Sequence, residues 1–336
     1  MSRLNTGNNH PLITRNPTYM IINKMVTVHS EDRDITHWPN ANEFEITLPE
    51  PFLNIQSVKL EQIMLPNNHY QFSNQFQNIV LPMTINGVSN IFIVITEGYY
   101  TPQQLAIQIT QQITQEGGAI TCTYNSINQK FNFESNDPFS IDANIDGYKE
   151  VFINKYNSGC NKDYTTNGSS FDHYNEWGLP YNLGFFRTSY NAIETEPNVF
   201  EIEAPTVCNL NTHDTIYMEL NMFNSLDELK PFPQRTNHLY NNDYNGSVNS
   251  AFAKLPVTTV PQEKIILSKS DLIQNTSSIS NPPIERLQKL KFKFRYHDGK
   301  LVDFKESNLN FTLSFALFSN ELIRTTTDQV PYGYGF

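Results

Sequence analysis

KLKFKFRYHDGKLVDFKESNLNFTLSFAL, residues 289–317, is the stretch that decides the fold class. In residues 290–296 every second position is apolar, and lysine or arginine fills the positions between. Residues 309–317 alternate in the same way, with small polar residues opposite the apolar ones. A period of two is typical of a β-strand with one buried face. Asp298-Gly299 between the runs is a strong signal for a tight turn.

The same strand pattern extends toward the N-terminus. Residues 43–48 alternate and are followed by Pro49 and Pro51, which we expect to end the strand. Residues 58–64 alternate as well. Asn86-Gly87 predicts a hairpin, because both residue types tolerate positive φ. The chain therefore contains many short strands separated by turn signals.

One segment has helical periodicity. Thr101-Pro102-Gln103-Gln104 combines an N-cap threonine, a proline at the first helical position and a glutamine at the third. Leu105, Ile109 and Ile113 then recur every four residues, and Gly117-Gly118 follows. We expect a helix that packs its apolar face on a sheet.

These patterns predict an all-β fold with one or two short helices. We expect an antiparallel β-sandwich, jelly-roll-like, with long loop insertions. Residues 1–20 are assigned to a flexible N-terminal arm, 21–320 to the sandwich and 321–336 to a C-terminal tail. A loop-rich insertion is expected at about 137–195, anchored by three aromatic residues: Trp177, Phe185 and Phe186.

The composition narrows the functional classes. The chain has 336 residues, 41 of them asparagine, and a net charge of −11. An acidic balance argues against nucleic acid as the main partner. Cys122, Cys160 and Cys208 are too widely spaced for a zinc motif or a disulfide framework, and we expect reduced thiols. No signal peptide, nucleotide-binding motif, nucleophile elbow or HExxH pair is visible.

The cluster Glu31-Asp32-Arg33-Asp34 is the best catalytic candidate. Glycoside hydrolysis needs two carboxylates about 5–10 Å apart, and neighbours in a turn rarely face each other in that way. A calcium loop would need a glycine for its bend, and none is present. We interpret the cluster, with Trp38, as a structural turn in which Arg33 hydrogen-bonds to carbonyls or carboxylates.

Two sets of residues are candidate interface positions. The first is a basic stripe on one strand face, and the second is the aromatic tail: Lys289, Lys291, Lys293 and Arg295; Tyr332, Tyr334 and Phe336. The basic stripe fits a solvated sheet face, docking against an acidic neighbour or another subunit, or contact with nucleic acid. The tail fits either a disordered end or an arm that buries its rings in a partner.

Four ordered segments point to a family: HSEDRD, WPNANEFEITLPEPFLNIQSVKLEQIMLPNN, ITEGYYTPQQLAIQI and FKFRYHDGKLVDFKESNLNFTLSF. Together they resemble minor capsid proteins of the nucleocytoplasmic large DNA viruses, which include algal and amoebal giant viruses. The resemblance covers residues 25–135 and 285–318. The middle of the chain departs from this resemblance, which leaves open the position that the protein takes in a viral capsid shell.

This resemblance implies a jelly-roll structural protein of an icosahedral shell, assembled in the host cytoplasm, without enzymatic activity or cofactor. The implied partners are major capsid protein capsomers and neighbouring minor capsid proteins, rather than a small-molecule substrate. The resemblance leaves open whether the protein lies near an inner membrane or at the exterior of the shell. Two alternatives are a surface glycan-binding or host-attachment protein, whose loops include Trp177, and a carbohydrate-active enzyme that uses the carboxylates of the structural turn.

Overall fold

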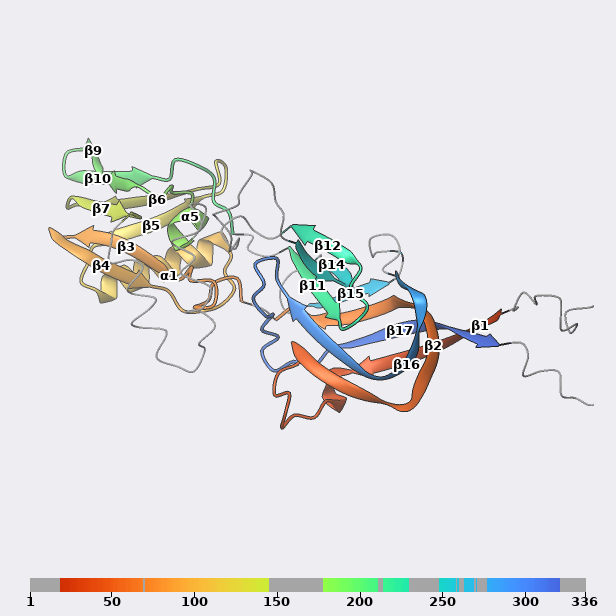
Figure 1. Cartoon of the computed structure of the whole chain (residues 1–336). Coiled ribbons are helices and arrows are strands. Elements are labelled where there is room, and N and C mark those ends of the chain that lie inside the picture. Colours follow the sequence, from red (N-terminus) through yellow and green to blue (C-terminus); the bar gives the residue numbers. More distant parts are fainter. Residues whose placement is uncertain are drawn as a thin grey trace, which may run out of the picture. The chain divides into compact units, whose positions relative to one another are not determined.

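The computed structural model describes residues 19–68, 70–144, 178–210, 214–229, 248–257, 259, 263–268, 270 and 277–320. The described elements are mainly antiparallel strands, accompanied by two α-helices and one short 3-10 helix (Figure 1). The predicted all-β class with one or two short helices is therefore confirmed.

The chain divides into two compact units. Unit 1 comprises residues 1–68, 215–229 and 248–336, and unit 2 comprises residues 69–214 and 230–247. The prediction of one sandwich over 21–320 differs from this division, because unit 2 is inserted between two strands of unit 1. The insertion begins near residue 69, well before the loop-rich segment that we expected at 137–195.

Unit 1 is built on a curled seven-stranded sheet. Its strand order is β1-β17-β2-β16-β11-β14, with β15 also paired to β2, and β12 and β13 form a separate pair. The strands and the 3-10 helix η1 have these bounds: β1 Tyr19–His29, η1 Ser30–Asp32, β2 Glu43–Pro66, β11 Thr215–Leu220, β12 Leu226–Leu229, β13 Val248–Ala251, β14 Ala253–Pro256, β15 Lys264–Ser268, β16 Ser277–Arg295 and β17 Asn310–Asn320.

Strand β2 continues through the two prolines that we expected to end it. Its pairing with β16 jumps from Thr47 to Phe52, so the residues between them have no ladder partner on that side. Proline is tolerated there because no ladder hydrogen bond needs its missing N–H. A second register shift lies further along β2, where Leu60 and Gln62 pair with two consecutive residues of β17. This shift also changes which side chains of β2 point into the core.

The Asp298-Gly299 turn forms, but it does not join two directly paired strands. Gly299 has a φ of +86°, and the Tyr296 N–H donates to the Lys300 carbonyl at 2.9 Å. Strands β16 and β17 then pair with opposite edges of β2, so β2 lies between them. The alternation at 290–296 and 309–317 is as predicted: its apolar positions are buried.

Aromatic rings from distant segments form much of the core of unit 1. The Phe292 ring lies 5.3 Å from that of Phe44 and 4.8 Å from that of Phe311, measured between centroids. The three rings belong to β16, β2 and β17, and all are fully buried. Such tilted and edge-on pairs each add about 0.5–1.5 kcal/mol beyond the burial of apolar area.

The described residues of unit 2 form two four-stranded sheets and two helices. The sheet orders are β4-β3-β7-β8 and β5-β6-β10-β9. Its elements have these bounds: β3 Val80–Ile85, β4 Val88–Val94, α1 Pro102–Gln115, β5 Ile120–Asn125, β6 Lys130–Ser135, β7 Phe139–Asp142, α5 Gly178–Asn182, β8 Ser189–Asn191, β9 Ile193–Glu196 and β10 Val199–Glu203.

Local signals account well for unit 2. Asn86 and Gly87 have φ of +52° and +75° and join β3 to β4 as the predicted hairpin. Helix α1 has the predicted capping box, in which Gln104 N–H donates to the Thr101 hydroxyl and the Gln104 side chain accepts from Thr101 N–H. Both predictions are confirmed.

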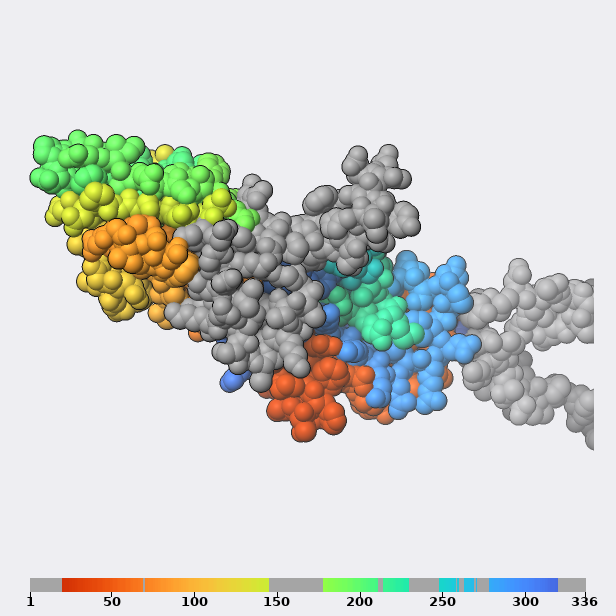
Figure 2. Space-filling model, turned by 60° about the vertical axis from the view of Figure 1, so that its left-hand side comes forward, coloured from red at the N-terminus to blue at the C-terminus, as the bar shows by residue number. Residues whose placement is uncertain are grey.

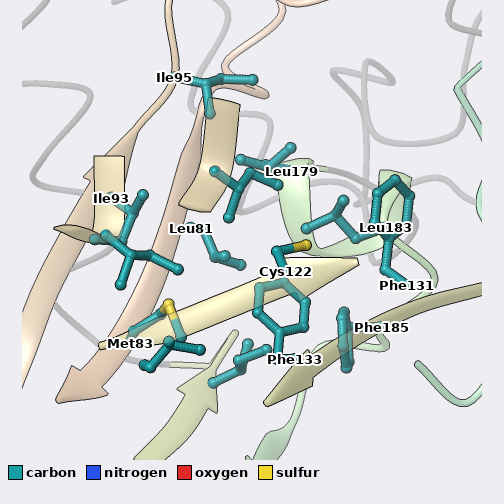
Figure 3. Packing of buried hydrophobic residues seen from close by; sticks show 14 of the residues in the cluster. Leu81, Met83, Ile93, Ile95, Cys122, Phe131, Phe133, Leu179, Leu183 and Phe185 are labelled. Atoms are coloured by element: carbon teal, nitrogen blue, oxygen red, sulfur yellow. The ribbon is translucent and has the colours of Figure 1, made fainter. Parts of the chain in front are cut away.

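One core connects both sheets and both helices of unit 2. Figure 3 shows Leu81, Ile93, Phe133 and Phe185 converging with other apolar side chains from β3, β4, β6 and the segment after α5. Phe185 is buried and its ring lies 5.9 Å from that of Phe133, as expected for an anchor. The same expectation is wrong for Phe186, which is 53% exposed. Trp177 lies outside the described residues.

Candidate functional site

The charged turn after β1 is built around a buried serine. Ser30 N–H donates to the Leu309 carbonyl at 2.9 Å, and Leu309 N–H donates to the Ser30 hydroxyl at 2.9 Å. The Ser30 hydroxyl also donates to the Asn308 side-chain oxygen at 3.0 Å. This exchange joins η1 to the segment before β17, so the turn is held by residues distant in sequence.

Arg33 holds the turn through four hydrogen bonds. Its guanidinium donates to three backbone carbonyls, those of Ser30 (2.7 Å), Trp38 (2.9 Å) and Pro39 (2.8 Å). It also donates to the Asn308 side-chain oxygen at 2.9 Å. The predicted tie to carbonyls is therefore observed, and the described hydrogen bonds of Arg33 include none to the flanking carboxylates.

Those carboxylates have separate partners. Asp34 accepts from Thr36 N–H at 3.0 Å, and its second carboxylate oxygen lies 2.5 Å from His37 Nδ1. Glu31 lies 3.8 Å from His29. The hydrogen bond from the His37 side chain is the main cause that lowers the pKa of Asp34, assisted by the Thr36 and His37 backbone and opposed by desolvation. The described side-chain contacts of Glu31 and Asp34 are therefore with two different histidines.

The basic stripe faces acidic residues of the neighbouring strand. Lys289 forms an ion pair with Glu45 at 2.8 Å, and Lys291 forms one with Glu43 at 2.7 Å. Lys293 lies opposite Glu43 on β2 and Glu219 on β11 in the strand register. Figure 2 shows the N-terminal red and C-terminal blue segments sharing one surface, as this cross-strand pairing requires. Two lysines of the stripe are therefore paired with glutamates of this chain's own β2.

Trp38 joins the turn to the stripe. Its ring lies under the Lys291 ammonium group, 4.9 Å from nitrogen to ring centroid. The backbone N–H of Trp38 donates to the Asp34 carbonyl at 2.8 Å. Because a cation over an indole ring contributes about 0.5–1 kcal/mol at exposed sites, Trp38 adds a modest further link between the loop and β16.

Arg295 differs from the three lysines of its stripe because it is 2% exposed. Its guanidinium forms ion pairs with Glu219 and Glu228 and lies 5.1 Å from the Tyr217 ring. His297 contacts the second oxygen of Glu228 at 3.1 Å. The expectation of a solvated position is wrong here, because β12 brings Glu228 over the end of β16.

No pattern in the sequence indicated this buried group. Glu219 and Glu228 lie about 70 residues before Arg295, the first in a run that indicates a short strand and the second in a run that indicates a loop. One guanidinium nitrogen, Nη2, is buried without a hydrogen-bond partner among the described atoms. Because a buried carboxylate such as that of Glu228 is costly without its cation, the pair with Arg295 links β12 to the sheet.

The cysteines and the aromatic tail lie only partly within the described residues. Cys122 and Cys208 carry free thiols, and burial raises the pKa of the Cys122 thiol well above its usual range. Cys160 and the aromatic tail residues Tyr332, Tyr334 and Phe336 lie outside the described residues. Within the described ranges, no group of three or more His, Cys, Asp or Glu residues is arranged to hold a metal ion. No helix in the same ranges is long and apolar enough to cross a membrane.

Comparison with known proteins gives structural likeness but no match in sequence. No family model matches the chain, and no curated protein matches it. Among solved structures, the chain is similar to the crystal structure of the mavirus penton protein, with a TM-score of 0.41 and 10% sequence identity. The alignment covers 89% of this chain and 99% of the penton protein chain.

Proposed function

We propose that this chain is a structural minor capsid protein of a large DNA virus. In this role it assembles and cements an icosahedral shell through contacts with major capsid protein capsomers and neighbouring minor capsid proteins. It acts without a cofactor and without enzymatic activity. Its location is the capsid of the virion, which assembles in the host cytoplasm.

One observation carries the proposal: three of the four segments that resemble minor capsid proteins meet in unit 1. HSEDRD forms the turn after β1, WPNANEFEITLPEPFLNIQSVKLEQIMLPNN contains β2, and FKFRYHDGKLVDFKESNLNFTLSF runs from β16 into β17. These strands are neighbours in the order β17-β2-β16. The resemblance therefore follows one continuous sheet rather than scattered short matches.

The chemistry of these segments supports a structural role. Arg33 and Ser30 of the first segment bind Asn308 of the third, and Glu43 and Glu45 of the second pair with lysines of β16. Their polar groups are thus used to hold strands together. Contacts with neighbouring subunits would then come from exposed apolar side chains and strand edges, which give specificity through a few anchors.

The test is to locate the protein in purified virions. We expect a cryo-EM reconstruction to contain density for the curled sheet of unit 1 within the shell, and quantitative mass spectrometry to give a fixed copy number per particle. Absence from particles in which the major capsid protein is abundant would overturn the proposal. Specific binding on a glycan array, lost on Trp177→Ala, would favour the attachment alternative instead.

A further inference from the structure

Among the described residues, strand β1 is an edge strand that lacks the usual protection of an edge. It stands at the end of the seven-stranded order, with β17 as its neighbour in the described sheet. All eleven residues pair with β17 in one uninterrupted register, from Tyr19 opposite Asn320 to His29 opposite Asn310. Neither a proline nor a bulge interrupts it, although natural edge strands commonly use these features to prevent pairing with another chain.

Three large apolar side chains of this edge are exposed. Ile21 is 57% exposed, Ile22 44% and Met25 70%. Lys24, the charged residue among them, is engaged within its own chain. Its ammonium group pairs with Glu50 and lies 4.9 Å from the centroid of the Phe52 ring. The charge that would ordinarily guard such an edge is therefore neutralised locally.

The outer end of β1 extends past the body of the sheet. Pairing between β17 and β2 stops at Leu317 opposite Ile55, whereas pairing between β1 and β17 continues for three more residues. Figure 1 shows the two strands leaving the curled sheet together. Ile21 lies in this extension, opposite Phe318. Another strand can thus approach this end of the edge without meeting the curled body of its own sheet.

We propose that β1 pairs with β1 of a second copy of this chain, antiparallel and about a two-fold axis at Asn23. In an antiparallel pair, the side chains of directly opposite residues point to the same face of the sheet. A pairing with two-fold symmetry is therefore centred on one residue, which lies opposite the same residue of the second copy. With Asn23 at the centre, Ile21 lies opposite the second copy's Met25, and Met25 opposite the second copy's Ile21. Residues 19–27 take part in the pairing.

This register is the one that the side chains favour. It brings the two most exposed apolar side chains of β1 together twice on one face and places Ile22 opposite the aliphatic stem of the second copy's Lys24. Centring on Lys24 would place two lysines directly opposite each other, which is destabilising. Centring on Ile22 would leave Ile21 opposite the polar Asn23. A second copy therefore fits this edge because the edge is complementary to itself.

Self-association through β1 goes beyond the shell role and does not depend on it. We expect the full-length protein to show a concentration-dependent monomer–dimer equilibrium by sedimentation equilibrium. Ile21→Lys and Met25→Lys should each weaken dimerisation roughly tenfold or more, because each places a charge opposite an apolar residue twice. Ile279→Lys, at a 71% exposed position on β16, is the matched control and should leave the equilibrium unchanged.

The register itself is tested by a paired substitution. Ile21→Lys with Met25→Glu places a lysine opposite a glutamate at both positions, so this double variant should recover dimerisation that the single variants lose. Oxidised Asn23→Cys should give a disulfide between two copies of residue 23, identified by peptide mass spectrometry, whereas Thr27→Cys should not give a symmetric product. Circular dichroism confirms that each variant is folded.

A monomer at all concentrations would overturn the proposal. A dimer that persists in both single lysine variants would also overturn it, because the interface would then lie elsewhere. Failure of the double variant to exceed the single variants would exclude the Asn23-centred register. Each of these results is independent of whether the protein is found in virions, so the two proposals can fail separately.

Discussion

Units 1 and 2 are both β-rich, but the pairings between the most distant parts of the chain lie in unit 1. In unit 2, β3 and β4 are joined by the two residues Asn86 and Gly87, and β5 and β6 are also consecutive hairpin strands. In unit 1, β1 pairs with β17, so that Tyr19 faces Asn320. Unit 1 also pairs β2 with β16, across the whole of unit 2.

Pairings between distant parts of the chain need interactions that a hairpin does not need. A hairpin closes a short loop and is specified by its turn residues. A pairing between chain ends carries a larger loop-closure cost and is slow to form, so it needs specific side-chain contacts to define it. Unit 1 supplies them with aromatic pairs, cross-strand ion pairs and the buried Arg295 group, and the following predictions test that contrast.

The largest expected effects come from removing one core ring in each unit. Phe311→Ala in unit 1 and Phe133→Ala in unit 2 each delete a fully buried phenylalanine, which typically costs about 3–5 kcal/mol. Hydrogen exchange followed by mass spectrometry should show lost protection mainly in the unit that carries the substitution. Equal loss in both units for either variant would mean that the units unfold as one.

Arg295→Met is expected to destabilise unit 1 by about 3–5 kcal/mol, because it leaves the Glu219 and Glu228 carboxylates without their cation. Urea-induced unfolding measures the loss, and hydrogen exchange should place the first opening at β12 and β13. Lys293→Met, at a more exposed position on the same strand face, is the matched control and should change stability little. If both variants behave alike, the buried group does not fix β12 to the sheet.

Arg33→Ala removes four hydrogen bonds at the turn and should cost about 2 kcal/mol, since three of them satisfy backbone carbonyls. Asp32→Asn, one position earlier, should change the free energy of unfolding by less than about 0.5 kcal/mol. The comparison is made by denaturant titration. A larger loss of stability for Asp32→Asn than for Arg33→Ala would mean that the carboxylates, rather than Arg33, hold the turn.

The exposed cross-strand ion pairs should contribute much less. A double-mutant cycle of Lys289→Ala and Glu45→Ala is expected to give a coupling energy of about 0.2–1 kcal/mol that declines with salt. A coupling as strong as that of a buried pair would mean that these charges, rather than the rings, define the register between β2 and β16.

The smallest effect concerns pH. The pKa of Asp34 is lowered in the folded state from its ordinary value of 3.8, chiefly by the His37 side chain. Such a carboxylate adds stability above its unfolded-state pKa, and this stability is lost as pH falls through the lowered pKa. His37→Ala should therefore raise the pKa of Asp34 in an NMR titration of the side-chain carboxyl, whereas His29→Ala should not. An unchanged Asp34 pKa in His37→Ala would contradict this assignment.

Several features of the molecule were determined by sequence alone. The all-β class, the Asn86-Gly87 hairpin and the capped helix α1 follow from period, turn residues and caps, which act within a few residues. The sequence also indicated Arg33 as the residue that holds the charged turn. Three of its four partners are carbonyls within six positions, which a local pattern can indicate, whereas the fourth, Asn308, is distant in sequence.

Other features were decided only by the tertiary structure. No pattern in the sequence indicated that residues 69–214 form a separate unit inserted between β2 and β11. Pro49 and Pro51 continue β2 because its partner β16 leaves that stretch unpaired. Arg295 is buried, unlike the lysines beside it, because β11 and β12 bring two glutamates to it. In each case the deciding partner lies far away in sequence, and only the packed sheet brings it into contact.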